Sequence, residues 1–143
     1  MSGKVWWFLI ILVLVATPAM AEQKLFLTCT NGRDPETNAP VGMPNFFPIV
    51  VDLEARTLAF GDHRPEPVKH LDGQTIEAMI INTRTDLDIT LWTNLTIDRV
   101  AGRLRAFSWM DNCAGNQQGM PRGMCTVLNA LYDCSSTPPK PKF

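Results

Sequence analysis

The sequence lacks the short motifs that mark common enzyme chemistries. The Gly-x-Ser-x-Gly turn of serine hydrolases is missing, and so are the glycine-rich phosphate loops G-x-G-x-x-G and G-x-x-x-x-G-K. Ser108 lies between two aromatic residues, with no histidine nearby in the sequence to activate it. We therefore predict a protein that is not an enzyme and that uses no cofactor.

An excess of either charge is also lacking. The chain carries 13 Lys and Arg against 14 Asp and Glu, which gives a formal net charge of −1 at pH 7. The basic residues are scattered singly and in pairs, whereas a nucleic-acid surface would show as a basic excess or stripe. We expect no nucleic-acid partner.

Only one long apolar run is present, and it is too short to cross a bilayer. The run Val5–Ala16 would measure roughly 18 Å as a helix, against a hydrocarbon core of about 30 Å. Lys4 precedes it, and Pro18 followed by the small-residue pattern Ala19-x-Ala21 comes after it. This order is typical of a cleaved secretory signal peptide. We predict that residues 1–21 are removed and that the product is soluble, without a membrane span, in the periplasm or secreted.

Cysteine is sparse but even in number, with 4 residues in the chain, all after the predicted cleavage site. In an exported protein this favours two disulfides, for which 3 connectivities exist. We favour Cys113 with Cys125, which closes a Gly- and Gln-rich segment, and Cys29 with Cys134, which joins the first strand to the last. A metal site is the alternative, but C-x11-C and C-x8-C fit no zinc pattern well and no histidine is near.

Turn-forming residues divide the chain after residue 21 into short segments with alternating apolar side chains, a pattern that predicts strands. The expected strands are 24–30, 46–53, 57–60, 75–82, 88–93, 95–98, 103–109 and 126–134. A short helix remains an alternative for 75–82, and for 126–134 as well. Segment 31–45, with three prolines, is predicted to be a long loop, and 61–67 a second connector.

The regular strand spacing and the lack of a normal amphipathic helix predict an all-β fold, either a small antiparallel β-barrel or a sandwich. We assign residues 22–134 to a single domain and expect the proline-containing tail 135–143 to be disordered. A bridge from Cys29 to Cys134 suits a barrel, because it requires the first and last strands to be neighbours.

One pattern occurs twice, as V-D-x-x-A-x-x-L from Val51 and as I-D-x-x-A-x-x-L from Ile97. The interpretation we favour is shared hairpin geometry, in which Asp52 and Asp98 each cap the backbone of a turn. The alternative is a pair of carboxylates that bind a common ligand.

The histidines form the only cluster of potential metal ligands or acid-base groups. His63 and His70 lie near Asp62, Glu66 and Asp72. Two prolines between the histidines stiffen the segment, so an extended chain would hold the imidazoles roughly 20 Å apart. We interpret both as exposed loop histidines and predict no metal site. A small metal-dependent hydrolase that uses this region is the alternative.

Aromatic residues give the most direct indication of a binding surface. Trp92, Phe107 and Trp109 lie in predicted strands near the segment between Cys113 and Cys125, which also contains Arg122. Aromatic side chains beside a disulfide-closed loop are typical of a recognition surface. The alternative is that the tryptophans are core residues and the loop a simple surface excursion.

The layout of the chain has a known parallel. An early strand ending in Cys29, a V-D-x-x-x-x-T-L hairpin from Val51, an I-D-R-x-x-G-x-L hairpin from Ile97 and a closing Tyr132-x-Cys134 are similar to small uncharacterised exported β proteins of bacteria. The overall plan also resembles the periplasmic inhibitors of c-type lysozyme. That resemblance implies a small β-barrel whose terminal cysteines pair.

Together these features predict a non-enzymatic exported β domain that binds a protein or a cell-envelope component through its loops. A different possibility is a carrier of a lipid or another small ligand, with an apolar barrel interior. The sequence does not predict an oligomeric state.

Overall fold

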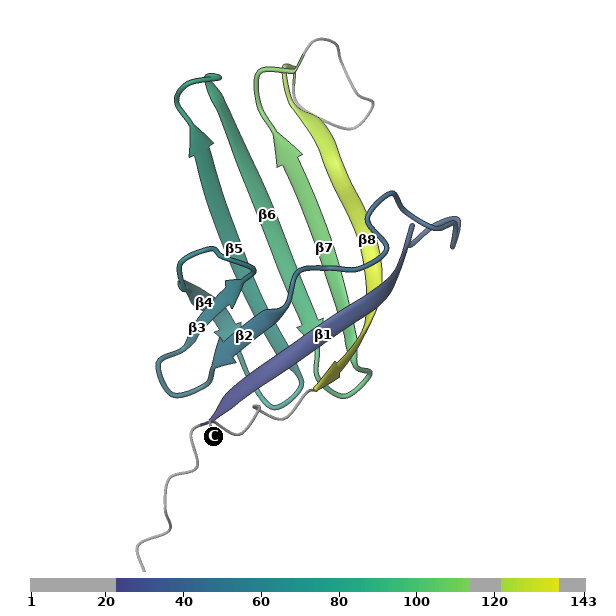
Figure 1. Ribbon diagram of the computed structural model, residues 1–143, viewed down its shortest axis with the longest axis vertical. Helices are drawn as coiled ribbons and strands as arrows, with labels where there is room; N and C mark the ends of the chain where they lie inside the picture. Colours follow the sequence, from purple (N-terminus) through teal and green to yellow (C-terminus); the bar gives the residue numbers. More distant parts are fainter. Residues whose placement is uncertain (1–22, 114–121, 137–143) are drawn as a thin grey trace, which may run out of the picture.

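The computed structural model describes residues 23–113 and 122–136 (Figure 1). The described chain folds into eight β-strands, which are β1 (Lys24–Arg33), β2 (Ile49–Asp52), β3 (Thr57–Phe60), β4 (Glu66–Leu71), β5 (Thr75–Arg84), β6 (Ile89–Asp98), β7 (Arg103–Met110) and β8 (Cys125–Ser136). Each strand pairs antiparallel with the next one, and β8 pairs with β1. The strands therefore form a closed barrel. This confirms the predicted all-β fold and decides between its two predicted architectures in favour of the barrel.

Several predicted boundaries need correction. Residues 66–71 form β4, a strand that was not predicted: its first two residues fell in the predicted connector 61–67, and 68–71 were assigned to no element. The predicted strands 88–93 and 95–98 are joined into one continuous strand, β6, which begins at Ile89 and leaves Asp88 in the preceding turn. Residues 75–82 and 126–134 both lie in strands, β5 and β8. β8 continues to Ser136, so the first two residues of the predicted tail belong to the barrel; the rest of that tail and the predicted signal peptide lie outside the described residues.

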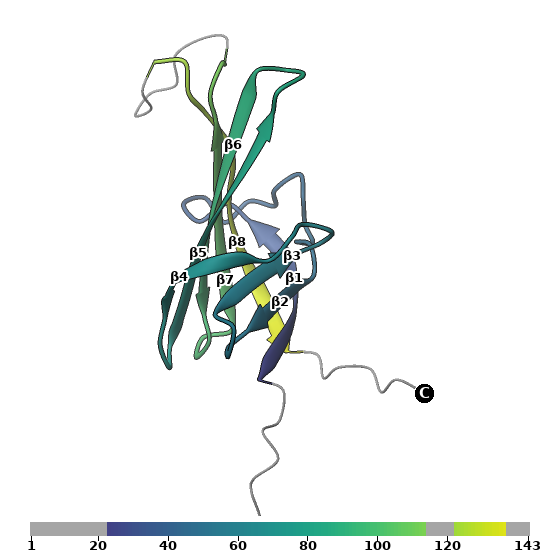
Figure 2. The same ribbon diagram turned by 90° about the vertical axis from the view of Figure 1, so that its left-hand side faces the viewer.

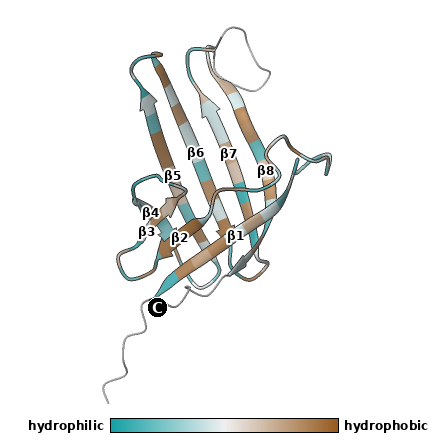
Figure 3. Cartoon of the chain, viewed as in Figure 1, coloured by the Kyte–Doolittle hydropathy of each residue, from teal (hydrophilic) through white to brown (hydrophobic). Residues whose placement is uncertain are grey.

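The inner face of β5–β8 is built in rows with one residue from each strand. Along β6 and β7, hydrophobic and hydrophilic residues alternate in bands, because successive side chains point to opposite faces of the sheet (Figure 3). The first row consists of Ile76, Ile97, Leu104 and Tyr132, and the second of Ala78, Leu95, Ala106 and Ala130. Every side chain in these two rows is buried, with at most 2% of its surface exposed. Residues of β2 and β3, among them Val51 and Leu58, complete the same core. We call this half of the barrel the core end.

The two walls of the barrel differ in length. Strands β2, β3 and β4 have 4, 4 and 6 residues, whereas β5, β6 and β8 have 10, 10 and 12. Figures 1 and 2 show the upper parts of β5–β8 rising beyond the short strands. The inner face of β5–β8 is therefore left without an opposing strand at that end, which we call the cavity end.

Both predicted disulfides are confirmed. Cys29 and Cys134 are register partners on β1 and β8, and their bond fastens the seam at which the barrel closes. Cys113 and Cys125 join the segment after β7 to the start of β8. Within residues 23–113 and 122–136, no helix has the length and apolar character needed to cross a bilayer.

The repeated Asp pattern forms two hairpin turns, as expected. Asp52 Oδ1 accepts a hydrogen bond from the backbone N–H of Ala55 at 2.8 Å. Asp98 Oδ1 accepts two, from the N–H groups of Val100 at 2.9 Å and Ala101 at 2.8 Å. Each carboxylate thus caps its own turn, which confirms the favoured interpretation of the pattern.

Candidate functional site

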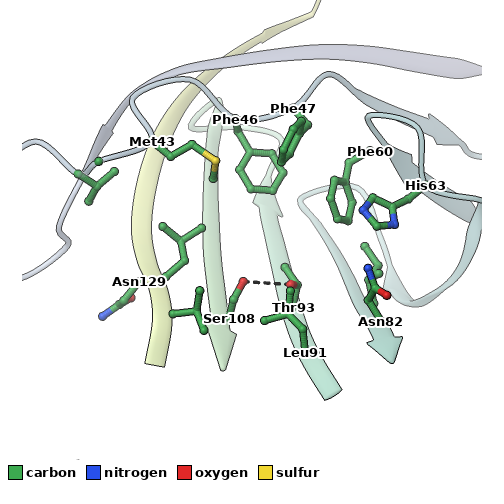
Figure 4. Close-up of a pocket in the computed structure, with 15 residues that line it drawn as sticks. Met43, Phe46, Phe47, Phe60, His63, Asn82, Leu91, Thr93, Ser108 and Asn129 are labelled. Carbon is green, nitrogen blue, oxygen red and sulfur yellow. Dashed lines mark hydrogen bonds between the residues drawn. The ribbon is translucent and has the colours of Figure 1, made fainter. Parts of the chain in front are cut away.

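A cavity of about 600 Å³ lies at the cavity end, between the long wall and the loop that follows β1 (Figure 4). Ile80, Leu91, Thr93, Ser108 and Leu128 line it from β5–β8. Met43, Phe46, Phe47, Phe60 and His63 line it from the opposite side. Its position follows from the unequal strand lengths, because the inward side chains of β5–β8 at this level face a loop, the last residue of β3 and the turn after it, instead of a full strand.

The loop of residues 34–48, which we call the covering loop, is fixed to the barrel by hydrogen bonds. The hydroxyl of Tyr132 donates to the carbonyl of Met43 at 3.0 Å. The backbone N–H of Gly32 donates to the carbonyl of Pro44 at 2.8 Å, and that of Phe46 to the carbonyl of Cys29 at 2.9 Å. These bonds tie both β1 and β8 to the covering loop, which therefore forms a defined side of the cavity.

Gly32 is needed for this close approach. A Cβ atom at this position would lie 2.5 Å from Cε1 of Tyr132 and 2.7 Å from the carbonyl oxygen of Met43. Real Cβ atoms do not come so near to backbone atoms, so any larger residue would push the covering loop away from Tyr132. Burial also raises the pKa of Tyr132, whose hydroxyl thus stays a neutral donor to the loop.

Aromatic rings continue the side of the cavity from the covering loop to the β3–β4 turn. The ring centroid of Phe46 lies 5.3 Å from that of Tyr132 and 5.6 Å from that of Phe60. Phe47 packs on Phe60 with ring centroids 5.8 Å apart, and the His63 ring packs on the same Phe60 with centroids 4.5 Å apart. Edge and tilted contacts at these distances are favourable for aromatic pairs. They present a largely apolar surface to the cavity.

Two hydroxyl groups interrupt the apolar wall on the other side. Thr93 and Ser108 are register partners on β6 and β7, and their Oγ1 and Oγ atoms lie 3.0 Å apart (Figure 4). Their exposed fractions are only 7% and 5%. Either oxygen can be the donor of the hydrogen bond between them. We call these two residues the hydroxyl pair.

The cavity contains few other polar groups. His63 and Asn82 lie together at one side, whereas Asn129 points away from the cavity (Figure 4). No Asp, Glu, Lys or Arg is among the described residues that line it. A cavity with this lining suits an uncharged, mostly apolar molecule, because a buried charge would have no partner.

The predicted binding residues lie on the outside of the same strands. Trp92 and Trp109 are register partners on β6 and β7, and their rings stack with centroids 6.2 Å apart and planes 11° apart. Phe107 packs beside Trp109 at 5.4 Å. Ile81, opposite Trp92 on β5, is 54% exposed. We call these four residues the outer aromatic surface, and the two tryptophans are outward-facing and half-buried instead of part of the core.

Arg122 does not join this group. It is exposed at the start of the short described segment before β8. Among the described residues, no ring contact or ion pair connects it to the two tryptophans or to Phe107. The structure thus brings together three of the four residues that the sequence assigned to a binding surface.

The histidine cluster is divided between two places. His63 is exposed and borders the cavity beside Phe60, whereas His70 lies in β4 instead of a loop and contacts Asp72 at 2.8 Å between Nε2 and Oδ2. The backbone N–H of Thr75, the His70 side chain and the N–H of Gln74 lower the pKa of Asp72 to about 2. In the described chain no three His, Cys, Asp or Glu side chains gather in an arrangement that could hold a metal ion.

Fold and site define an eight-stranded, disulfide-bonded antiparallel barrel with an apolar cavity at one end. Comparison of the chain with protein-family models, with curated protein sequences and with solved structures gave no match.

Proposed function

We propose that this protein is an exported carrier that holds one uncharged, apolar small molecule in the cavity. The observation that carries the proposal is a cavity of about 600 Å³ with aromatic and aliphatic walls and no acidic or basic side chain other than His63 among its described lining residues. Ligand sites commonly measure about 300–1,000 Å³ and are lined in this way. An eight-stranded barrel is also the size that can hold one small ligand.

Export is part of the proposal. The first residues have the order of a signal peptide, and two disulfides stabilise the barrel. Such bonds persist in oxidising compartments such as the periplasm or the extracellular space. An apolar molecule that must cross an aqueous space there gains from a carrier, because burial removes its surface from water.

Burial of apolar surface drives the proposed binding, so affinity should depend on ligand length. Each buried CH2 group contributes about 0.8 kcal/mol, which is roughly fourfold in Kd. Within a series of unbranched alkanes, affinity should therefore rise with each added carbon until the cavity is filled, and then stop rising. A flat series would indicate that the molecules adsorb on the surface.

The direct test is a titration of the chain from residue 22 onward with N-phenyl-1-naphthylamine, an uncharged fluorophore that brightens in apolar surroundings. We expect saturable binding of one molecule per chain. Leu91→Trp fills the cavity and should abolish this binding, since Leu91 is a lining residue. Ile81→Trp adds the same side chain to the outer face, where Ile81 is 54% exposed, and should leave binding unchanged.

Two results would contradict the carrier function. One is the absence of any saturable signal with the unmodified chain. The other is an equal loss of binding in Leu91→Trp and Ile81→Trp, which would locate the fluorophore outside the cavity. Circular dichroism of both variants shows whether the barrel is retained.

A second candidate function is recognition of a protein or cell-envelope component through the outer aromatic surface. The stacked pair of Trp92 and Trp109 beside the exposed Ile81 supports it, because tryptophan is enriched at the centres of interfaces. Capture from envelope extracts with the chain and with Trp92→Ala tests this candidate. A partner retained equally by both proteins would exclude this surface, and Leu91→Trp serves as the matched control that leaves the surface intact.

A further inference from the structure

The hydroxyl pair lies at the boundary between the cavity and the filled core. Ile80, Thr93, Ser108 and Leu128 form one row across β5–β8. The next row toward the core end consists of Ala78, Leu95, Ala106 and Ala130, each with 0% of its surface exposed. Thr93 and Ser108 are therefore the innermost polar side chains that a molecule in the cavity can reach.

This pair has a hydrogen-bond donor to spare. Each hydroxyl has one proton and can donate once. One proton bridges Thr93 Oγ1 and Ser108 Oγ at 3.0 Å. The second proton has no acceptor among residues 23–113 and 122–136. Buried donors in native proteins nearly always have a partner, so this proton is available to an acceptor atom that enters the cavity.

The acceptor is limited to uncharged groups. The only titratable side chain among the described lining residues is that of His63, which lies across the cavity from the hydroxyl pair (Figure 4). A carboxylate beside the pair would be buried without a positive partner, which is strongly unfavourable. A carbonyl oxygen of a ketone or an ester can accept the proton without a charge.

We propose that the ligand is an uncharged, lipid-like molecule with a carbonyl group, whose oxygen accepts a hydrogen bond from the Thr93–Ser108 pair. Its apolar chain fills the remainder of the cavity toward Phe46, Phe47 and Phe60. This inference rests on the proposed carrier function and adds to it the chemical class and the orientation of the ligand.

The test compares how two matched probes respond to the removal of both hydroxyls. 2-Decanone and undecane have the same number of non-hydrogen atoms, and each displaces N-phenyl-1-naphthylamine from the chain. In the double variant Thr93→Val with Ser108→Ala, we expect the affinity for 2-decanone to fall about 3- to 10-fold, as the loss of one hydrogen bond requires. The affinity for undecane should stay the same or rise, since the wall becomes more apolar.

Single variants sharpen the test. In Ser108→Ala the hydroxyl of Thr93 loses its partner and is free to donate to the ligand, and the reverse holds for Thr93→Val. Each single variant should therefore keep 2-decanone affinity within about twofold of the original value, because one donor remains. Only the double variant removes the last donor, so the two losses are not additive.

Each outcome has a defined meaning. An equal decrease for both probes in the double variant would assign the pair a packing role and overturn the proposal. No change for either probe would mean that water satisfies the pair, which also overturns it. Decanoate at pH 8 should bind more weakly than 2-decanone, and tighter binding of decanoate would instead place the polar group of the ligand near His63. If the fluorophore itself shows no saturable binding, the carrier function fails as well.

Discussion

The core end and the cavity end of this barrel are built from the same four strands, β5–β8, yet they differ in what faces those strands. At the core end, side chains of β2 and β3 meet the two inner rows of β5–β8, and every side chain of these two rows is buried. At the cavity end the short strands have stopped, and the covering loop and the β3–β4 turn border an open cavity of about 600 Å³. Unequal strand length is therefore sufficient to create a ligand-sized site in a small barrel.

Two leucines on β6 show the contrast within a single strand. Leu95 and Leu91 point to the same inner face, because side chains alternate along a strand. Leu95 has 0% exposure in the core, whereas Leu91 borders the cavity. The same residue type thus has a structural role at one level and a ligand-facing role at the other.

The largest effect is expected from the disulfides. Cys29 and Cys134 are 105 residues apart in sequence, and the loop-entropy relation gives about 4–5 kcal/mol for such a bridge. Cys113 and Cys125 are 12 apart, which gives about 3 kcal/mol. Urea unfolding of the two double Cys→Ala variants should show the larger loss for the first pair. The reverse order would mean that the cavity end, and not the β1–β8 seam, limits stability.

The second largest effect on stability is expected from substitution of Leu95, with Leu91 as its comparison. Leu95→Ala should lower the free energy of unfolding by about 2–5 kcal/mol, because it leaves a void in a filled core. Leu91→Ala should cost about 1 kcal/mol or less, because its side chain already borders empty space. Equal losses in urea unfolding would show that the cavity is closed off and packed in solution.

The smallest effect concerns acid. Hydrogen bonds from Arg33 and then Asn31 lower the pKa of Asp133 from 3.8 to about 2. A carboxyl with a lowered native pKa stabilises the fold above its unfolded pKa, and this contribution is lost as pH falls through the native pKa. Stability should therefore decrease between about pH 4 and pH 2, through protonation that breaks the link between β1 and β8.

Asp133→Asn tests this assignment. The variant should show a smaller decrease in its urea midpoint over that pH range than the unmodified chain. Asp72 in the β4–β5 turn also has its pKa lowered to about 2, by contacts away from the seam, so Asp72→Asn should reduce the acid response separately and measures the part that does not come from the seam. An unchanged acid response in Asp133→Asn would show that protonation of Asp133 at the β1–β8 seam does not cause the loss of stability.

Much of the fold could be predicted from the sequence because its signals are local. Alternation of apolar residues identified most strands, and an even cysteine count in a chain with a signal-like start predicted the two bridges. Trp92, Phe107 and Trp109 were grouped because they lie in predicted strands near the segment between Cys113 and Cys125, and the structure adds that Trp92 and Trp109 are register partners. β4 was missed because Pro65 and Pro67 are strong turn signals, although Pro67 occupies a strand position opposite Thr57.

The cavity could not be predicted in the same way. It depends on which inner positions of β5–β8 meet an opposing strand, and this is decided by the lengths of β2–β4 and by the path of the covering loop. One trace of it is present in the sequence. Thr93 and Ser108 are polar residues at inward-facing positions of strands whose neighbouring inward-facing residues are apolar, which indicates a break in the core at that level.

Isoleucine methyl NMR during a titration with N-phenyl-1-naphthylamine tests the central claim most directly. Ile80 and Ile81 are neighbours on β5, but Ile80 lines the cavity and Ile81 is exposed on the outer aromatic surface. We expect a large shift of the Ile80 methyl signal, with Ile81 and the core residues Ile76 and Ile97 nearly unchanged. A shift confined to Ile81, or no shift at Ile80 at saturation, would contradict it.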